Sequence, residues 1–207
     1  MSGEKPVIGI LALQGDFDAH KSALARAGAH AREIRSEEDL NHIDGLVLPG
    51  GESTTMLKLL HEENLFEPVR QFGSCNPIFG TCAGAILLAK RVLHPEQASL
   101  GLMDLTVERN AYGRQIDSRI AKLDLEHEPV EAVFIRAPII RETGPDVHVL
   151  LRYMDAPVLV EQGKHMAATF HPELTKDARV HSKFVEKVQA YRAQRTRGAR
   201  SQNGRAL

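Results

Sequence analysis

The sequence predicts an α/β fold: a single three-layer domain with a central mixed, mostly parallel sheet. Three observations predict it. Short aliphatic runs that end in glycine or a polar turn occur at residues 6–13, 44–51 and 76–80, which is typical of buried parallel strands. Segments with helical spacing of apolar residues separate these runs. The chain has 207 residues, 43% of them hydrophobic, which is enough for the core of one such domain.

In the first half of the chain, each expected strand is an aliphatic run and each expected helix is an amphipathic stretch. In order, they are a strand at Pro6–Leu13, a helix at Asp16–Ala27, a strand at Asp44–Gly51, helices at Thr54–Glu63 and Leu65–Phe72, a strand at Asn76–Gly80 and a helix at Ala85–Ala89. Gly28 closes the first helix as a C-terminal cap. Strands that alternate with helices in this way predict a sheet covered on both faces.

In the second half, strand-like segments follow one another with turns between them and little helix. These segments lie at residues 101–110, 130–137, 147–154, 157–163 and 164–170. We expect mixed or antiparallel strands that join the same sheet. A last helix is expected from Lys176 to about Arg192, where Val180, Phe184 and Val188 recur at helical spacing. The arginine-rich end lacks this periodicity, so we expect one domain over residues 1–192 and a disordered basic tail over residues 193–207.

The charge balance and hydropathy exclude several classes of protein. With 26 basic and 27 acidic side chains, the net charge of −1 provides no general attraction to nucleic acid or an anionic membrane, and neither partner is expected. No apolar run approaches the roughly 18 residues that span a bilayer, and the first residues lack the pattern of a secretory signal. We therefore expect a cytoplasmic protein. The histidines show no metal-binding pattern such as H-E-x-x-H, so no metal or cofactor is expected.

Cys82 has the surroundings of a catalytic nucleophile. It is the central residue of Gly80-Thr81-Cys82-Ala83-Gly84, which has the G-x-nucleophile-x-G form and lies between an expected strand and an expected helix. Glycines on both sides let the chain make the sharp turn that exposes the central side chain. A helix N-terminus favours the thiolate, and the Ala83 N–H would point towards an oxyanion. The alternative is a buried structural cysteine in a glycine-rich turn, and this is our interpretation of Cys75, which has no such setting.

His171 is the best candidate for the base that a thiol nucleophile needs. It stands in His171-Pro172-Glu173, where proline favours an extended backbone, so the side chains of His171 and Glu173 should project to the same side. Glu173 can then orient the imidazole while its other nitrogen faces the thiol. The alternative is a simple loop turn. The other histidines, His20 and His181 among them, we interpret as solvated side chains.

Three further stretches contain candidates for binding a substrate. Backbone N–H groups around Gly50 and Gly51 can supply a second oxyanion donor. Arg109 can grip a carboxylate with two hydrogen bonds, although an arginine near a hairpin turn is usually a surface charge. Arg136 follows an apolar strand, where a charge is costly unless it serves a site or is paired. Ser53 has the alternative role of capping the helix that follows it.

Six motifs in order along the chain resemble those of the class I glutamine amidotransferases. They are LALQG (residues 11–15), LPGGEST (48–54), GTCAGAILLA (80–89), LTVERNAYGRQ (105–115), FIRAP (134–138) and FHPEL (170–174). Within that class, the set is most similar to the glutaminase subunits of pyridoxal 5'-phosphate synthases, over about residues 7–188. The acidic stretch Gln14–His20 and the arginine-rich end are departures from the pattern.

The resemblance implies a class I glutamine amidotransferase-like (flavodoxin-like) domain that hydrolyses L-glutamine through a cysteine thioester. It implies a catalytic triad of Cys82, His171 and Glu173, with oxyanion donors at Gly51 and Ala83. The residues implied to bind glutamine are Gly51, Glu52, Ser53, Arg109, Ile135 and Arg136. The ammonia would pass under cover to a (β/α)8-barrel synthase subunit, in a large hetero-oligomer that makes the vitamin B6 cofactor. Binding of that subunit is expected to complete the oxyanion hole.

Three other functions remain open at the level of sequence. A glutaminase that serves another synthase, such as imidazole glycerol phosphate synthase, would have a similar nucleophile motif and His-Pro-Glu, although the motifs at residues 105–115 and 48–54 argue against it. A non-catalytic protein that senses glutamine or docks a partner would have no need of an intact Cys82, His171 and Glu173. A cysteine peptidase would not need arginines suited to one amino acid.

Overall fold

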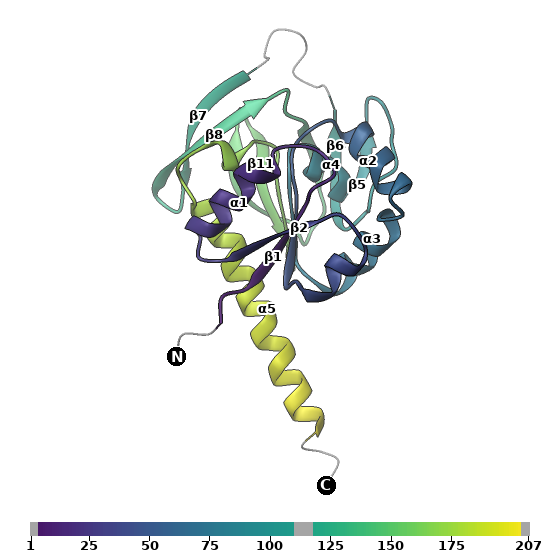
Figure 1. Ribbon diagram of the computed structural model, residues 1–207. Helices are drawn as coiled ribbons and strands as arrows, with labels where there is room; N and C mark the ends of the chain where they lie inside the picture. Colours follow the sequence, from purple (N-terminus) through teal and green to yellow (C-terminus); the bar gives the residue numbers. More distant parts are fainter. Residues whose placement is uncertain (1–3, 110–117, 204–207) are drawn as a thin grey trace.

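The computed structural model describes residues 4–109 and 118–203, and its middle layer is a sheet of seven strands (Figure 1). The end of the motif at residues 105–115 and the last residues of the predicted tail, 204–207, lie outside the described residues. The strands of this central sheet, in spatial order, are β10 (His148–Tyr153), β11 (Ala156–Gln162), β12 (His165–Ala168), β4 (Ile78–Thr81), β3 (Gly45–Leu48), β1 (Val7–Leu11) and β2 (His30–Ile34).

The five strands from β12 to β2 are parallel, whereas β11 is antiparallel to β12 and β10 is antiparallel to β11. This confirms the predicted α/β class and the mixed, mostly parallel sheet. β4 therefore lies in the interior of the sheet, with β3 and β12 as its two neighbours.

Helices cover both faces of the sheet, which gives the predicted three layers. They are α1 (Phe17–Arg26) and α5 (Arg179–Asn203) on one face, and α2 (Ser53–Glu62), α3 (Phe66–Cys75) and α4 (Ala83–Leu88) on the other. Side chains along a strand alternate between the two faces. In β3, Leu46 and Leu48 belong to the apolar core beneath α2, α3 and α4, and Val47 belongs to the core beneath α1 and α5. All three are fully buried, as expected for a strand covered on both sides.

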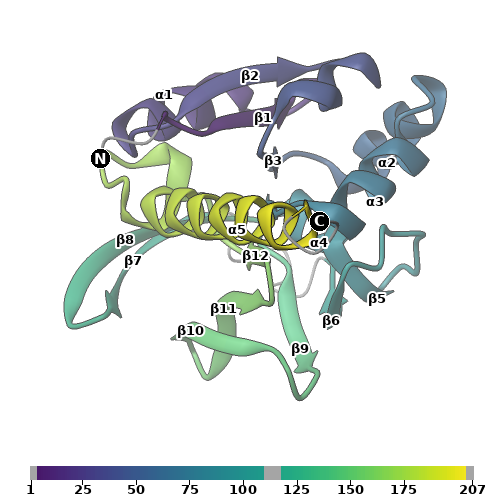
Figure 2. The same ribbon diagram turned by 90° about the horizontal axis from the view of Figure 1, so that it is seen from below.

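Two smaller sheets flank the central one at opposite sides of the molecule (Figure 2). Their strands are β5 (Ala89–Leu93), β6 (Met103–Glu108) and β9 (Ile139–Thr143) in one sheet, and β7 (Ser118–Leu125) and β8 (Glu128–Ile135) in the other. The expectation that the strands of the second half join one sheet is therefore wrong for β6 and β8, and the sequence did not single out β5, β7 and β9 as strands. Each small sheet has an apolar face of its own: Met103 and Leu105 pack on the α2–α4 side, and Val130 and Phe134 on the α5 side.

The helix boundaries also differ from the predictions. α3 extends to Cys75 instead of Phe72, and α5 begins at Arg179 and continues to Asn203, past the predicted end near Arg192. Alanine, glutamine and arginine are good helix formers, so the helix does not need an apolar face to continue. Two short 3₁₀ helices, η1 (Glu38–His42) and η2 (Pro172–Leu174), complete the fold. Among the described residues, no helix combines the length and the apolar character needed to cross a bilayer.

Candidate active site

Cys82, His171 and Gly51 follow three neighbouring strands at the carboxyl-terminal edge of the central sheet. Cys82 follows β4, His171 comes shortly after β12, and Gly51 comes shortly after β3. The Cys82 N–H donates to the Ala168 carbonyl at 2.8 Å, which continues the pairing of β4 with β12 past the last strand residue. This edge of a parallel sheet is where α/β proteins bind their ligands.

Cys82 has the strained backbone of a nucleophile elbow. Its φ of 48° and ψ of −103° lie where non-glycine residues rarely occur, directly before the first residue of α4. The flanking glycines are required by space. A Cβ at Gly80 would lie 2.5 Å from the carbonyl carbon of Gly84, and a Cβ at Gly84 would lie 2.0 Å from the Leu48 oxygen. The crowding expected around Cys82 from the sequence is therefore present.

His171 is held between β8 and η2. Its backbone N–H donates to the Val133 carbonyl at 2.8 Å, and Pro172 begins η2 directly after it. The imidazole Nδ1 lies 2.7 Å from Glu173 Oε1, and the Glu173 side chain has no solvent exposure. The expected contact between the two side chains is present, but a 3₁₀ turn produces it instead of an extended segment.

The environment of His171 favours the imidazolium. Burial lowers the pKa of His171, but its hydrogen bonds with Cys82 and Glu173, together with the negative charges of these two groups, outweigh burial and raise the pKa to about 10. At neutral pH the ring therefore carries a proton that it can donate. Cys82 itself is 5% exposed, and its Sγ lies 4.0 Å from the Ile135 carbonyl oxygen.

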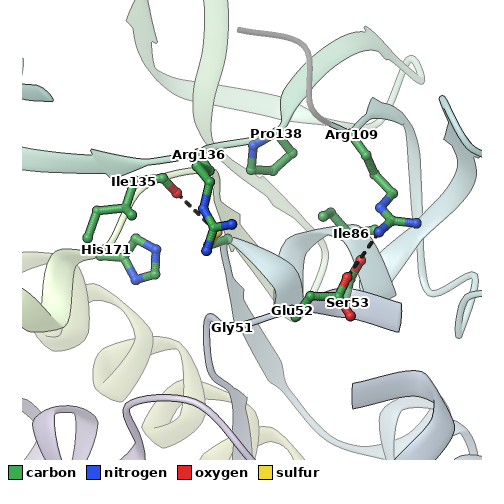
Figure 3. A pocket seen from close by; sticks show the side chains of 10 residues that line it. Gly51, Glu52, Ser53, Ile86, Arg109, Ile135, Arg136, Pro138 and His171 are labelled. Carbon is green, nitrogen blue, oxygen red and sulfur yellow. Dashed lines mark hydrogen bonds and ion pairs between the residues drawn. The ribbon is translucent and has the colours of Figure 1, made fainter. Parts of the chain in front are cut away.

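A pocket of about 250 Å³ opens in front of Cys82 and His171 (Figure 3). It is lined by Gly51, Glu52, Ser53, Cys82, Ile86, Arg109, Ile135, Arg136, Pro138 and His171. All six residues that the resemblance assigns to glutamine binding thus meet at one cavity with the thiol and the imidazole. Glu173 lies behind His171. The sequence did not single out Ile86 and Pro138, although both stand within motifs of the resemblance.

Glu52 and Arg109 form an ion pair at one wall of the pocket. Arg109 is 9% exposed and donates from Nη2 to Glu52 Oε1 at 3.1 Å and to Thr54 Oγ1 at 2.8 Å. Glu52 also caps α2, since its carboxylate accepts from the N–H groups of Thr54 and Thr55 at 3.1 and 2.7 Å. The capping role considered for Ser53 therefore belongs to Glu52, and the Ser53 hydroxyl donates to Gln97 Oε1 at 3.1 Å instead.

Arg136 extends from the end of β8 into the same pocket (Figure 3). Its backbone φ of 43° is unusual for a residue with a side chain, so the turn after Ile135 is strained in the way common at functional sites. The side chain is exposed, unlike that of Arg109. The cationic wall of the pocket thus combines one buried, paired guanidinium with one that is accessible to a ligand.

The positions of Gly51 and Ala83 suit backbone hydrogen-bond donors. Gly51 has a φ of 142°, which strains any other residue, and a Cβ there would lie 2.8 Å from Gln14 Nε2. Gln14 Nε2 in turn donates to the Glu52 carbonyl at 2.7 Å and ties this loop to the segment after β1. Ala83 is the first residue of α4, so its N–H has no carbonyl partner within the helix.

Sequence reasoning missed a buried polar cluster behind Glu173. His20 and His181 were expected to be solvated, but neither is exposed, and the expectation is wrong. His20 Nε2 lies 3.5 Å from Glu173 Oε2, and His20 Nδ1 lies 3.0 Å from His181 Nε2. A signal was available: His20 precedes Ala23 and Leu24 at helical spacing, which places it on the buried face of α1.

Cys75 also differs from its expectation. It was interpreted as a buried structural cysteine, but it is exposed at the end of α3, where its Sγ lies 3.4 Å from Ser74 Oγ. The helix α3 extends three residues further than predicted, to Cys75. In its last turn Phe72 and Gly73 are buried, and Cys75 is not. Cys82 is therefore the cysteine that is enclosed within the site.

Comparisons with known proteins identify relatives over most of the chain. Residues 10–190 match the model of the SNO glutamine amidotransferase family. A protein of Solibacter usitatus named pyridoxal 5'-phosphate synthase subunit PdxT is 59% identical over 189 residues, which are 87% of this chain and 98% of that protein. A protein of Thermus thermophilus with the same name is 52% identical over 185 residues, covering 87% of this chain and 96% of its own length.

Solved structures agree with the fold. A structure described as a glutamine amidotransferase has a TM-score of 0.83 and 49% sequence identity, and the match covers 88% of this chain and 98% of the other. A putative GMP synthase protein from Thermoplasma acidophilum has a TM-score of 0.69 at 17% identity, over 94% of this chain and 99% of that one. The second likeness concerns the fold alone.

Proposed function

The chain belongs to the SNO glutamine amidotransferase family, and from this premise we propose that it is the glutaminase subunit of a pyridoxal 5'-phosphate synthase. The observation that carries the proposal is the pocket in which Cys82 and His171 meet the Glu52–Arg109 pair and Arg136. Relatives that span almost the whole chain and are named for this synthase support the choice among glutaminases. The motifs at residues 105–115 and 48–54 argue against the alternative, a glutaminase that serves imidazole glycerol phosphate synthase.

The reaction begins when the Cys82 thiolate attacks the side-chain amide carbon of glutamine. The tetrahedral oxyanion accepts hydrogen bonds from N–H groups at Gly51 and Ala83. The C–N bond then breaks, and the His171 imidazolium gives its proton to the leaving nitrogen, which departs as ammonia. A γ-glutamyl thioester remains on Cys82. His171, now neutral, accepts a proton from water as the water attacks the thioester, and glutamate and the thiolate are released.

Recognition of glutamine uses the charges at the pocket wall. The ammonium of the substrate suits the Glu52 carboxylate, and its carboxylate suits a guanidinium. Among the described residues, Arg109 makes its hydrogen bonds through Nη2, which leaves its other N–H groups to donate to a ligand. Arg136 supplies a second, accessible guanidinium. Ser53 and the Ile135 backbone complete the proposed binding set.

The ammonia has to reach a second protein before it is protonated. Because relatives of this chain are named as one subunit of the synthase, we assign the acceptor site to a separate (β/α)8-barrel synthase subunit in a large hetero-oligomer. Docking of that subunit completes the oxyanion hole at Gly51, and the free glutaminase is expected to be nearly inactive. We place the complex in the cytoplasm, where a reduced catalytic thiol persists.

An electrophilic glutamine analogue tests the glutaminase assignment in the complex with the barrel subunit. We expect one covalent adduct per chain, on Cys82, and none with Cys82→Ala. Cys75→Ala is the matched control, because Cys75 is an exposed thiol outside the pocket. Loss of labelling in the control, or undiminished labelling of Cys82→Ala, would contradict the assignment. A protein that only senses glutamine would bind the analogue without an adduct.

Reconstitution tests the choice of synthase. The chain mixed with a barrel subunit of pyridoxal 5'-phosphate synthase is expected to copurify with it and to form pyridoxal 5'-phosphate from glutamine and the two sugar phosphates. The mixture with Cys82→Ala should need added ammonia instead of glutamine. If glutamine is hydrolysed only with the cyclase subunit of imidazole glycerol phosphate synthase, the family is right and the assigned pathway is wrong.

A further inference from the structure

Behind the triad lies a buried polar cluster that the reaction described above does not use. Its members are His20, Thr81 and His181, from α1, β4 and α5, and none of the three is exposed. His20 Nε2 lies 3.1 Å from Thr81 Oγ1 and 3.5 Å from Glu173 Oε2. His20 Nδ1 lies 3.0 Å from His181 Nε2. Three separate elements therefore converge on the side of Glu173 that faces away from the pocket.

Glu173 needs a donor on this side. Its Oε1 is engaged by His171 at 2.7 Å, but Oε2 is buried and lacks a hydrogen bond of ordinary length among the described residues. A buried carboxylate oxygen without a donor is costly. His20 Nε2, at 3.5 Å, is the described ion-pair partner of this oxygen. A small movement of the carboxylate brings the two atoms within hydrogen-bond distance.

The contacts of the cluster favour a proton on Nε2 of His20, where the N–H can be shared between Thr81 Oγ1 at 3.1 Å and Glu173 Oε2 at 3.5 Å. His20 can donate to Glu173 only from Nε2–H, and its Nδ1 is then an acceptor for the Nε2–H of His181. Within the part of the chain that the structure describes, His181 Nδ1 is buried without a hydrogen-bond partner, and in this arrangement it carries a lone pair and no proton. An unpaired acceptor is more common in proteins than an unpaired donor. The opposite arrangement would bury an N–H of His181 and leave Glu173 Oε2 without a donor.

Both histidines of the cluster are neutral. Burial, followed by the nearby His181 and His171, lowers the pKa of His20 well below its usual value. Burial, followed by the charge of Arg26, lowers the pKa of His181 to about 3. The titratable groups that face His20 are thus Glu173, His171 and His181. A neutral donor can hold Glu173 without competing with the His171 imidazolium for its negative charge.

We propose that His20 is a positioning residue of the glutaminase reaction: its Nε2–H holds Oε2 of Glu173, so that Oε1 stays aimed at Nδ1 of His171. The inference rests on the proposed function, since a catalytic role of His171 is what makes its orientation matter. The arrangement of the cluster, however, can be measured without glutamine.

Two substitutions separate the two nitrogens of His20. The amide of His20→Gln reaches the position of Nε2 and can still donate to Glu173, whereas the amide of His20→Asn reaches only the position of Nδ1. In the complex with the barrel subunit, we expect His20→Asn to lower kcat for glutamine about tenfold with KM little changed, the scale of one lost hydrogen bond to a charged group. His20→Gln should stay within about threefold of the wild type.

Alkylation of Cys82 by iodoacetamide supplies a readout that needs no glutamine. We expect the same order, with His20→Asn slower than His20→Gln. By NMR titration, the pKa of His171 should be lower in His20→Asn than in the wild type, because Glu173 no longer stays beside the imidazolium. His165→Asn is the matched control: His165 is a buried histidine whose Nδ1 accepts from the Ile78 N–H, outside the pocket. It should leave kcat and alkylation unchanged.

Three results would overturn the inference: equal kcat in His20→Asn and His20→Gln, an equal loss in His165→Asn, or a wild-type His20 that carries its proton on Nδ1 by ¹⁵N NMR. The last measurement needs no variant to fold. Wild-type protein that fails to hydrolyse glutamine with any barrel subunit would refute the proposed function. In that case, His20 with a proton on Nε2 and the expected order of alkylation rates would still support the inferred arrangement.

Discussion

At the scale of single residues, the proposed reactive pair, Cys82 and His171, depends on the missing side chain of Gly50. A Cβ at this position would lie 2.3 Å from His171 Cε1, 2.9 Å from His171 Nδ1 and 3.4 Å from Cys82 Cβ. The backbone of the loop after β3 thus passes directly against both reactive residues. Only a hydrogen atom fits there while the imidazole keeps its place beside the thiol.

Gly50→Ala should therefore displace the imidazole and lower kcat by about 100-fold, the scale associated with a misplacement of about 1 Å. Turnover of glutamine in the complex with the barrel subunit measures the effect. Gly73→Ala is the matched control, because its Cβ would meet Leu102 Cδ1 at 2.3 Å, a similar clash away from the pocket. The control should lose stability and keep kcat. Equal kcat values for the two variants would contradict the role given to Gly50.

The raised pKa of His171 predicts a loss of stability at alkaline pH. Burial opposes the imidazolium, but the contacts with Cys82 and Glu173 prevail and raise the pKa to about 10. A folded-state pKa above the unfolded value means that the stabilisation is complete below about pH 6.5 and disappears as the pH rises to about 10. In urea unfolding, the difference in the free energy of unfolding between the wild type and His171→Asn should decrease as the pH rises across this range. If this difference in the free energy of unfolding stays constant from pH 6 to 10, the His171 imidazole is neutral in the folded protein and the prediction is wrong.

The sequence singled out Cys82 and His171, which the structure brings to one pocket, but it did not single out the buried residues behind Glu173. Cys82 and His171 stand in local motifs whose neighbours, glycine and proline, have strong conformational preferences. His20 has no such neighbours. It reaches Glu173 only because α1 packs beside η2. The two residues are far apart in the chain, so the only local sign of their contact is that His20 lies on the buried face of α1.

At the scale of elements, the start of α2 shows how one carboxylate serves a helix and the pocket together. Glu52 caps the helix through the N–H groups of Thr54 and Thr55 and pairs with Arg109. Partial burial raises the pKa of Glu52, but the hydrogen bonds from Thr54 and Thr55 outweigh it and lower the pKa to about 2. The orientation of this wall of the pocket is thereby coupled to the first turn of α2.

Glu52→Ala should destabilise the protein by about 1 kcal/mol, the usual effect of losing an N-terminal cap. The lowered pKa of Glu52 in the folded state stabilises the protein above about pH 4.5, and this stabilisation is lost as the pH falls to about 2. The free energies of unfolding of the variant and the wild type should therefore differ mainly above about pH 4.5. Urea unfolding at pH 7 and pH 3 measures both effects. Glu62→Ala, at the other end of α2 and paired with Lys58 at 3.5 Å, is the control and should have little effect.

In the first half of the chain, the strands that the sequence predicted are the ones buried on both sides. Continuous aliphatic runs such as those of β1 and β3 are distinctive, whereas β2 has the sequence HAREI, and of its residues only Ile34 is fully buried. β7 alternates exposed and half-buried residues up to Leu125, because one side of its hairpin with β8 faces solvent. Polar strands of this kind look like loops in a search for apolar runs.

At the scale of the whole molecule, α5 joins the domain only along its first part. Val180, Phe184 and Val188 belong to the buried core. The helix then projects away from the body (Figure 1). Among the described residues, its last hydrogen bond to another element is donated by Arg195 Nη1 to Asn76 Oδ1 at 2.9 Å. We therefore propose that the folding unit needs little of residues 193–207.

Removal of residues 198–207 should leave the melting temperature within about 2 °C and the glutaminase activity of the complex unchanged, because it keeps Val180, Phe184 and Val188, through which α5 packs in the core. Differential scanning calorimetry and glutamine turnover measure the two quantities. Phe184→Ala is the contrasting variant, with an expected loss of about 3–5 kcal/mol from a fully buried ring. A marked drop in melting temperature after truncation would place the end of α5 within the folding unit.

The overall architecture followed from the sequence, but the division of the second half into three sheets did not. A strand-like pattern tells which residues are buried and not which strand they pair with. Residues 101–110 and 164–170 were therefore both expected in the central sheet, although β6 pairs with β9 and β12 pairs with β4. Turn lengths did not resolve this, because both partners are distant in sequence. The pairing is decided by tertiary packing, which the local pattern does not contain.

The direct pairing of β4 with β12 has a consequence for how such a chain can diversify. Since Thr81 and Ala168 are in register, the segments that carry Cys82 and His171 start from adjacent strands, about 4.8 Å apart. The segment between β4 and β12 contains both small sheets, and the chain then returns to pair with β4. The parts of this segment that neither hold His171, as Val133 does, nor line the pocket, as Arg109 and Arg136 do, can be lengthened or exchanged while Cys82 and His171 keep their places.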